Sequence, residues 1–323
     1  MKSNSDYTLI AEEGINALSF PSGDLEGLYA PVKYGVSAGG KRLRPVLCLM
    51  GCDAYCGEAE RALPQAVGLE LFHNFTLLHD DVMDNSDLRR GRPTVHVKWD
   101  VNTAILSGDT MLTLATQKVS ECDDSMLRRV LTTFNDMALR VYEGQRLDMD
   151  FETHQTAVGL DAYMRMVGYK TGALLGAAAA IGATIGGASE KDATLFYDFG
   201  YKLGVAFQIQ DDYLDVFGDA ATFGKPIGGD ILNGKRTFLL ETAYKLGGED
   251  AEALKRAMQL PANETKIRTV TKIYEKMGLP EICRKEINKY SSAAIKSLKK
   301  TKISEEAMDA FRSLSDRLTG RRK

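Results

Sequence analysis

Hydrophobic residues recur at helical spacing along most of the chain. In residues 127–141, apolar side chains fall at i, i+3, i+4, i+7, i+10, i+11 and i+14, which predicts one amphipathic helix. The same period appears in residues 62–79, 103–119, 195–217 and 267–298, separated by short breaks containing glycine, proline, aspartate or asparagine. The alternation typical of strands is scarce. We therefore predict an all-α protein, folded as a single domain over residues 1–323.

Composition narrows the class of protein. With 323 residues, 44% of them apolar, the chain can bury a large core. Its 41 basic and 44 acidic residues give a net charge of −3, so the whole chain exerts no attraction on nucleic acid or on an anionic membrane. The five cysteines lack the spacing of a disulfide framework or a zinc site, and MKSNSDYTLIAEEG lacks the apolar centre of a signal peptide. These features predict a cytoplasmic protein with reduced thiols and no membrane span.

The main chemical signal is an acidic motif, D-D-x-x-D, that occurs twice. Its two copies contribute Asp80, Asp81, Asp84, Asp211, Asp212 and Asp215. On a helix, positions i, i+1 and i+4 lie on one side, so each triplet can direct its oxygens into one space. A single triplet is often a solvated helix end, but two copies, each ending an apolar helical run, favour metal binding. Mg²⁺ prefers oxygen ligands and often bridges carboxylates to phosphates, so the motifs predict Mg²⁺ and a phosphorylated ligand.

Basic residues accompany the acidic motifs. They lie in GGKRLRP at 39–45, RRGRP at 89–93, GYKTG at 168–172 and GKPIGGDILNGKRT at 224–237. Arginine meets phosphate oxygens with a planar fork and lysine with a compact charge, so both can bind a diphosphate. Neither a phosphate loop of the G-x-x-x-x-G-K-[ST] type nor a dinucleotide fingerprint is evident, and nucleotide binding is not indicated.

Taken in their order along the chain, these motifs resemble those of the trans-isoprenyl diphosphate synthases, also called polyprenyl synthetases. The resemblance covers nearly the whole chain. It implies antiparallel helices around a deep central cavity, normally in a homodimer. It also implies a prenyltransferase that condenses isopentenyl diphosphate with an allylic diphosphate (dimethylallyl, geranyl or farnesyl), with three Mg²⁺ ions on the allylic diphosphate.

The resemblance also implies site residues by position. The allylic diphosphate and its metals correspond to Asp80, Asp81, Asp84, Arg89, Lys170, Thr171, Gln208, Asp211, Asp212, Lys225 and Lys235. The isopentenyl diphosphate site corresponds to Lys41, Arg44, His73 and Arg90. Asp215 completes the second metal motif, directly or from the outer shell. Lys170, Lys225 and Lys235 would stabilise the departing diphosphate and are counted as catalytic together with Asp80, Asp81 and Asp211.

Product length is a separate expectation of the resemblance. Phe75 and Thr76 are the fifth and fourth residues before the first acidic motif, where the family commonly sets the floor of its cavity. One bulky and one small residue predict a short product, C15 farnesyl or C20 geranylgeranyl diphosphate. Phe75 as a simple core aromatic is the competing interpretation.

Several alternatives remain open from the sequence. A longer-chain polyprenyl synthase, a class I terpene cyclase, a head-to-head condensing enzyme and a noncatalytic partner subunit are the competing functions. A cyclase or a partner subunit would usually have altered one of the two aspartate motifs, and this chain keeps both. The terminal cluster Arg321, Arg322 and Lys323 is either a solvated tail or a segment that closes over the substrates.

Overall fold

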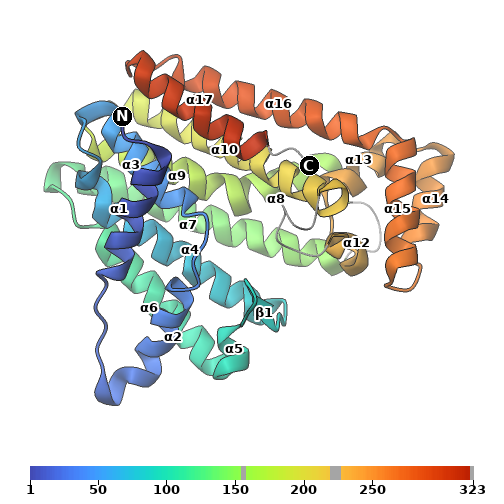
Figure 1. Cartoon of the computed structure of the whole chain (residues 1–323), viewed down its shortest axis with the longest axis horizontal. Coiled ribbons are helices and arrows are strands. Elements are labelled where there is room, and N and C mark those ends of the chain that lie inside the picture. The colour runs from blue at the N-terminus through green and yellow to red at the C-terminus, as the bar shows by residue number, and fades with distance from the viewer. Residues whose placement is uncertain (154–157, 219–226, 321–323) are drawn as a thin grey trace. The chain divides into compact units, whose positions relative to one another are not determined.

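The structure, a computed structural model, describes residues 1–153, 158–218 and 227–320 (Figure 1). Helices dominate these residues, so the all-α prediction is confirmed. The chain divides into two compact units, one of residues 1–135 and 178–196 and one of residues 136–177 and 197–323, with the boundaries falling inside three helices. The single-domain prediction is not tested by this division and stays a prediction. Within the described part of the chain, no helix is long and apolar enough to cross a membrane.

The first unit carries the first acidic motif. It comprises α1 (Asn4–Asn16), η1 (Gly23–Leu25), α2 (Glu26–Val36), α3 (Leu43–Cys56), η2 (Ala59–Ala62), α4 (Leu63–Met83), β1 (Leu88–Arg89), β2 (Arg92–Pro93), α5 (Val95–Lys98), α6 (Val101–Val119) and parts of α7 (Asp124–Thr153), α9 (Ala173–Ile185) and α10 (Glu190–Phe217). Helices α4 and α6 pack side by side along their lengths (Figure 1). The two short strands pair antiparallel in a hairpin.

The second unit carries the second acidic motif. Besides the remaining parts of α7, α9 and α10, it comprises α8 (Leu160–Val167), the π-helical turn η3 (Gly168–Gly172), α12 (Gly229–Asn233), α13 (Phe238–Leu246), α14 (Gly248–Met258), α15 (Glu264–Lys276), α16 (Leu279–Leu298) and α17 (Glu305–Thr319). Its core gathers buried side chains of α8, α10, α13 and α16, among them Tyr163, Ile209, Leu239 and Ile287. Helix α16 packs against α17, and α14 against α15 (Figure 1).

The boundaries of the helices follow recognisable signals. Ser3 and Asp6 form a capping box at the start of α1, and Asn263 caps α15 by accepting from two backbone N–H groups. The apolar period in residues 267–298 continues through two helices rather than one. Gly278, at a φ of +70°, ends α15, and Pro280 lies in the first turn of α16. This glycine–proline arrangement is the usual sequence signal for a helix end followed by a helix start.

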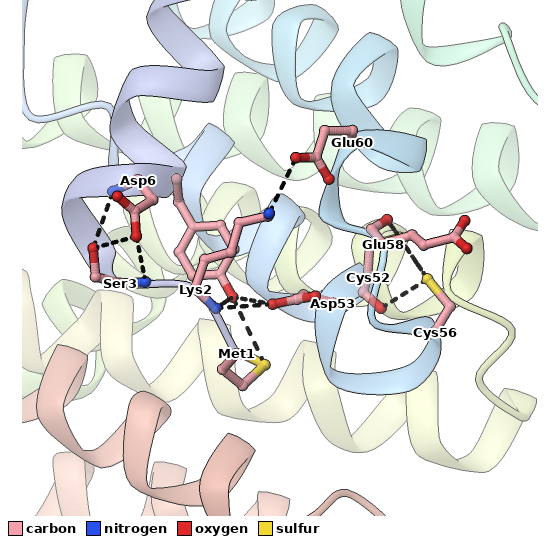
Figure 2. A network of polar contacts seen from close by, with 10 residues as sticks. Met1, Lys2, Ser3, Asp6, Cys52, Asp53, Cys56, Glu58 and Glu60 are labelled. Atoms are coloured by element: carbon pink, nitrogen blue, oxygen red, sulfur yellow. Dashed lines mark hydrogen bonds and ion pairs between the residues drawn. The ribbon is translucent and has the colours of Figure 1, made fainter.

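Helix α1 is fixed to α3 at its N-terminal end (Figure 2). The hydroxyl of Tyr7 donates to Asp53, and the backbone N–H of Lys2 donates to the same carboxylate at 3.2 Å. Near Asp53 on the same helix, the sulfur atoms of Cys52 and Cys56 lie 3.5 Å apart. This is hydrogen-bond distance, and the two cysteines form no disulfide. All five cysteines are free in the structure.

Candidate active site

The first acidic motif lies at the C-terminal end of α4. Asp80 and Asp81 occupy the last turn of the helix, and Asp84 is its C-cap. Asp84 is exposed, the side chain of Asp80 is 20% exposed, and Asp81 is buried. Carboxylates stabilise helix N-termini, whereas the C-terminal end of a helix carries partial negative charge. The helix dipole therefore does not stabilise three aspartates at this end, and their position favours a cationic ligand.

Arg89 meets this motif from the hairpin that follows α4. Its Nε and one terminal nitrogen both lie 2.7 Å from Oδ1 of Asp81, and that terminal nitrogen lies 3.9 Å from Asp80. The hairpin turns at Arg90 and Gly91, which have φ values of +53° and +74° as two-residue hairpin turns require. Burial raises the pKa of Asp81, and Arg89 opposes that rise. The structure thus brings Arg89 directly onto the acidic motif.

A cationic cluster of four arginines surrounds His73 on α4. Burial lowers the pKa of His73 well below its ordinary value, and the charges of Arg44, Arg90, Arg89 and Arg42 lower it further. His73 is therefore neutral at physiological pH. A β-carbon on Gly40 would lie 2.7 Å from the guanidinium of Arg90, so this arginine packs directly on the loop that precedes Lys41. Lys41 is exposed and Arg44 is half-buried. The four residues expected at the isopentenyl diphosphate site lie in the same unit.

The second acidic motif is held much more tightly by its surroundings. Oδ2 of Asp212 accepts from the Tyr163 hydroxyl at 2.5 Å and from the backbone N–H of Phe238 at 2.8 Å, while its Oδ1 accepts from Gln208 at 3.1 Å. Burial raises the pKa of Asp212 to about 7, and the nearby Asp230 contributes to the rise. Asp215 is buried and accepts from the backbone N–H of Asp230 at 3.0 Å. Asp211 is half-buried.

Five residues predicted at the allylic site line one pocket of about 40 Å³ in the second unit. They are Lys170, Thr171, Gln208, Asp212 and Lys235. The hydroxyl of Thr171 donates to Gln208 at 3.2 Å, and Lys170 donates to Asp148 at 2.7 Å. Residues from three segments that are distant in sequence therefore meet here.

A π-helical turn presents Lys170 and Thr171 to this pocket. Such turns are rare and occur often at functional sites. Gly144 on α7 makes the turn possible, because a β-carbon there would lie 2.3 Å from the backbone nitrogen of Lys170. The sequence GYKTG did not reveal the turn, because the close contact is with Gly144, which lies 24 residues before the turn begins.

The two candidate chain-length residues occupy different faces of α4. Phe75 is buried and contacts the rings of Phe72 and His79, at centroid distances of 5.5 and 4.9 Å. Thr76 is half-buried and donates to the backbone carbonyl of His73 at 2.8 Å. Both residues lie in the turn and a half that precedes Asp80, but successive helical residues point about 100° apart. Phe75 therefore packs in an aromatic cluster, and Thr76 shares the face of His73.

A larger groove of about 610 Å³ lies elsewhere in the first unit. It is lined by α1, α4 and α6 and contains none of the predicted site residues. Its α4 residues Leu63, Val67 and Leu71 precede Asp80 by 17, 13 and 9 positions, and at about 100° per residue Leu71 lies on the face opposite Asp80. The groove is therefore separate from the acidic motif.

The structure also identifies contributors that the sequence did not reveal. Asp148, Tyr163, Asp230 and Arg236 belong to the surroundings of Asp212 and Lys170; no local motif marks Asp148 or Tyr163, and Asp230 and Arg236 lie in the 224–237 segment without having been assigned a role. A ring nitrogen of His79 lies 3.0 Å from the carbonyl oxygen of Ile105 on α6. Lys225, His154 and the cluster of Arg321, Arg322 and Lys323 lie outside the described residues.

The chemistry of the carboxylates suits a hydrated magnesium ion better than an ion enclosed by protein ligands alone. In the part of the chain that the structure describes, no three His, Cys, Asp or Glu side chains converge tightly enough to hold an ion by themselves. The donors are nevertheless all hard oxygens, and Asp80, Asp84 and Asp211 are not fully buried. This set fits Mg²⁺ that keeps several waters and shares a substrate phosphate, since Mg²⁺ is usually bound by one or two carboxylates with phosphate oxygens.

Comparison with known proteins identifies the family. The family model for polyprenyl synthetases matches residues 26–277. The chain belongs to the polyprenyl synthetase family. It is 40% identical over 248 residues to a geranylgeranyl diphosphate synthase of Methanosarcina mazei, covering 76% of each chain. A crystal structure of a geranylgeranyl pyrophosphate synthase superimposes with a TM-score of 0.94 at 40% identity, with both chains fully covered.

A further polyprenyl synthetase relative was solved with ligands. The geranylgeranyl pyrophosphate synthase of Corynebacterium glutamicum, complexed with isoprenyl diphosphate and magnesium, matches at 29% identity and a TM-score of 0.83, over 99% of this chain and 97% of that one. The family and the isoprenoid synthase fold that the motifs predicted are therefore confirmed. So is the enzyme class, trans-prenyltransferase.

Proposed function

We propose that this chain condenses isopentenyl diphosphate with allylic diphosphates in a Mg²⁺-dependent reaction, with C20 geranylgeranyl diphosphate as its main product. The observation that carries the proposal is the pocket in which Lys170, Thr171, Gln208, Asp212 and Lys235 meet. The sequence resemblance does not by itself require these five residues to lie close together, so their meeting in one pocket is separate support for the proposal. The geranylgeranyl synthases among the relatives support the C20 product, and the relative complexed with isoprenyl diphosphate and magnesium supports the ligands.

Lys41, Arg44, Arg90 and His73 would bind isopentenyl diphosphate. Three cations with a neutral histidine suit a ligand that carries several negative charges on oxygens. Neutral His73 offers one donor and one acceptor nitrogen, so it can hydrogen-bond the diphosphate without adding charge. Their shared location in one unit supports this assignment.

Lys170, Thr171, Gln208 and Lys235 would bind the allylic diphosphate, with Arg89 on the side of the first motif. In the proposed reaction the allylic C–O bond breaks and its electron pair leaves with the diphosphate. The double bond of isopentenyl diphosphate then attacks the allylic carbon, and a proton is lost to the departing diphosphate. Lys170 and Lys235 stabilise the charge that grows on the leaving oxygen. Lys225 is assigned the same role from its sequence position.

Asp80, Asp81, Asp84, Asp211, Asp212 and Asp215 would hold the magnesium ions. Bound Mg²⁺ supplies Lewis-acid stabilisation of the leaving diphosphate and a template for its orientation. Asp80, Asp84 and Asp211 are the first choices as direct ligands, because they are more exposed than the buried Asp81, Asp212 and Asp215. Three ions remain the expected number.

A homodimer is part of the proposal. Helix α6 exposes Val101, Ile105 and Leu106, with side chains between 43% and 58% exposed. Large apolar side chains gathered on one exposed helix face commonly mark a protein interface. Light scattering of the purified protein measures its mass and tests this assembly. Cytoplasmic location remains a prediction from the sequence.

The test of function is a product assay. Purified protein is incubated with Mg²⁺, isopentenyl diphosphate and dimethylallyl, geranyl or farnesyl diphosphate, and the dephosphorylated products are sized. C20 product that disappears with EDTA supports the proposal. Hydrocarbon released from the allylic diphosphate alone would indicate a cyclase. Absence of turnover that a second subunit restores would indicate a partner subunit, and products far above C20 would indicate a longer-chain synthase.

The same assay tests the chain-length residues. If Phe75 floors the cavity, Phe75→Ala lengthens the product distribution and Thr76→Phe shortens it. An unchanged distribution from an active Phe75→Ala variant would mean that Phe75 is a core aromatic and that another residue sets the length.

A further inference from the structure

The basic residues of GGKRLRP separate into two kinds in the structure. Lys41 is exposed and Arg44 is half-buried, whereas Arg42, between them, is 3% exposed. Sequence alone treats all three as cations available to phosphate. The side chain of Arg42 is instead buried within the first unit, where it contacts Glu12 and Glu70.

Arg42 is bound by three other elements of the first unit. Its Nε lies 2.7 Å from Glu12 on α1, and one terminal nitrogen lies 2.7 Å from the buried Glu70 on α4. The other terminal nitrogen donates to the carbonyl of Val36 at the end of α2, at 3.1 Å, and to Glu12 at 3.3 Å. Because a guanidinium is a rigid planar fork, these contacts fix its orientation as well as its position.

The backbone at Arg42 is strained in a way that its side chain can stabilise. Arg42 has a φ of +45°, a left-handed conformation that non-glycine residues seldom adopt, and it immediately precedes α3. Such conformations persist where the surrounding structure holds them, and they are frequent at ligand sites. Two residues earlier, the guanidinium of Arg90 lies against Gly40. The segment that carries Lys41 and Arg44 is therefore held from both sides.

We propose that Arg42 is a positioning residue, whose buried ion pairs with Glu12 and Glu70 hold Lys41 and Arg44 in place for isopentenyl diphosphate. The inference rests on the proposed function and deepens it. The proposal makes helix α1 part of the support of the site. Glu12 on α1 contacts Arg42, and Asp53 on α3 contacts the N-terminal end of α1. Arg42 does not touch the substrate, and its charge is balanced by two carboxylates.

The experiment compares Arg42→Lys and Glu12→Gln with the matched control Glu13→Gln, an exposed change on the same helix. The readouts are KM for isopentenyl diphosphate, KM for the allylic substrate, kcat and Tm. Arg42→Lys keeps the charge and loses the fork, and we expect its KM for isopentenyl diphosphate to rise about tenfold, with KM for the allylic substrate within about twofold. Glu12→Gln keeps the Glu70 pair, and we expect a rise of about threefold. Glu13→Gln should match the wild type.

Binding of isopentenyl diphosphate by calorimetry, without turnover, should repeat the order of the KM values. Equal rises in both KM values, or a lowered Tm with an unchanged KM for isopentenyl diphosphate, would overturn the positioning role and leave Arg42 purely structural. A wild-type protein without condensation activity would overturn the proposed function itself. A Lys41→Ala variant with raised KM for isopentenyl diphosphate, alongside an unaffected Arg42→Lys variant, would overturn this inference alone.

Discussion

The two acidic motifs have the same spacing and very different surroundings. The first ends α4, with Asp84 exposed and Asp81 paired to Arg89. The second lies within α10, where Asp212 accepts hydrogen bonds from Tyr163, Gln208 and the backbone of Phe238. The first motif is balanced by an arginine side chain, and the second is balanced mainly by neutral donors.

This difference suggests that the two motifs contribute differently to binding a metal ion. An aspartate that accepts three hydrogen bonds from the protein has few lone pairs left for an ion, whereas an exposed aspartate can exchange water for a metal. The last aspartates of the two motifs show the same contrast. Asp84 is exposed, whereas Asp215 accepts a hydrogen bond from the backbone N–H of Asp230 in the first turn of α12. Equal spacing therefore does not mean equal roles. Under the proposed function, we expect the first motif mainly to bind the ligand and part of the second motif to support the site.

The largest expected effect is on turnover by the aspartates that remain accessible. Asp80→Asn and Asp211→Asn should each lower kcat by about a thousandfold or more, because each loses a ligand whose stabilisation of leaving-group charge is worth several kcal/mol. Neither change removes apolar packing, so Tm should stay within a few degrees of the wild-type value. Kinetics at saturating Mg²⁺ with calorimetric Tm measurements test both statements. The exposed Asp316→Asn is the control, and near-normal turnover in both variants would contradict the metal assignment.

The next effect separates the two diphosphate sites. Lys235→Ala, in the pocket of the second unit, should lower kcat about a hundredfold because it weakens stabilisation of the leaving diphosphate. Lys41→Ala, in the first unit, should raise KM for isopentenyl diphosphate about tenfold while kcat changes little. Steady-state kinetics with each substrate varied in turn measure the split. A Lys41→Ala variant that weakened only the allylic substrate would reverse the two assignments.

The sequence could predict those features of the two motifs that depend on residues close together in the chain. Helical period located α4 and α10, and the spacing of the aspartates located both motifs, because both signals lie within one or two turns of helix. The surroundings were not predictable, since Asp148 is 22 residues from Lys170 and Tyr163 is 49 residues from Asp212. The inward direction of Arg42 likewise depends on Glu12 and Glu70, which lie on other helices. By contrast, Gly278 and Pro280 form a local signal for the break between α15 and α16. The prediction of one helical period over residues 267–298 did not use that signal.

A smaller effect on stability should distinguish the third aspartates of the two motifs. Asp215→Ala removes the acceptor of the partly buried N–H of Asp230 and should lower the free energy of unfolding by about 0.5–1.5 kcal/mol. Asp84→Ala, at an exposed position, should change it by less than about 0.5 kcal/mol. Chemical denaturation of the two variants without substrates gives both values. Equal losses would remove the distinction between a binding and a supporting aspartate at these positions.

The smallest expected effect concerns His73 and the four arginines whose charges act on it. Burial first, and then the charges of Arg44, Arg90, Arg89 and Arg42, hold the pKa of His73 well below its ordinary value, so the folded protein keeps it neutral. The unfolded chain takes up that proton below about pH 6.5, so stability is lost as the pH falls, at no more than about 1.4 kcal/mol per pH unit for this one group. His73→Gln should therefore lose less stability than the wild type between pH 7 and pH 5, measured by denaturation at each pH. Nuclear magnetic resonance of the His73 ring gives the direct test: a ring that titrates in the folded protein near pH 6.5 would mean that the arginine cluster does not act on it.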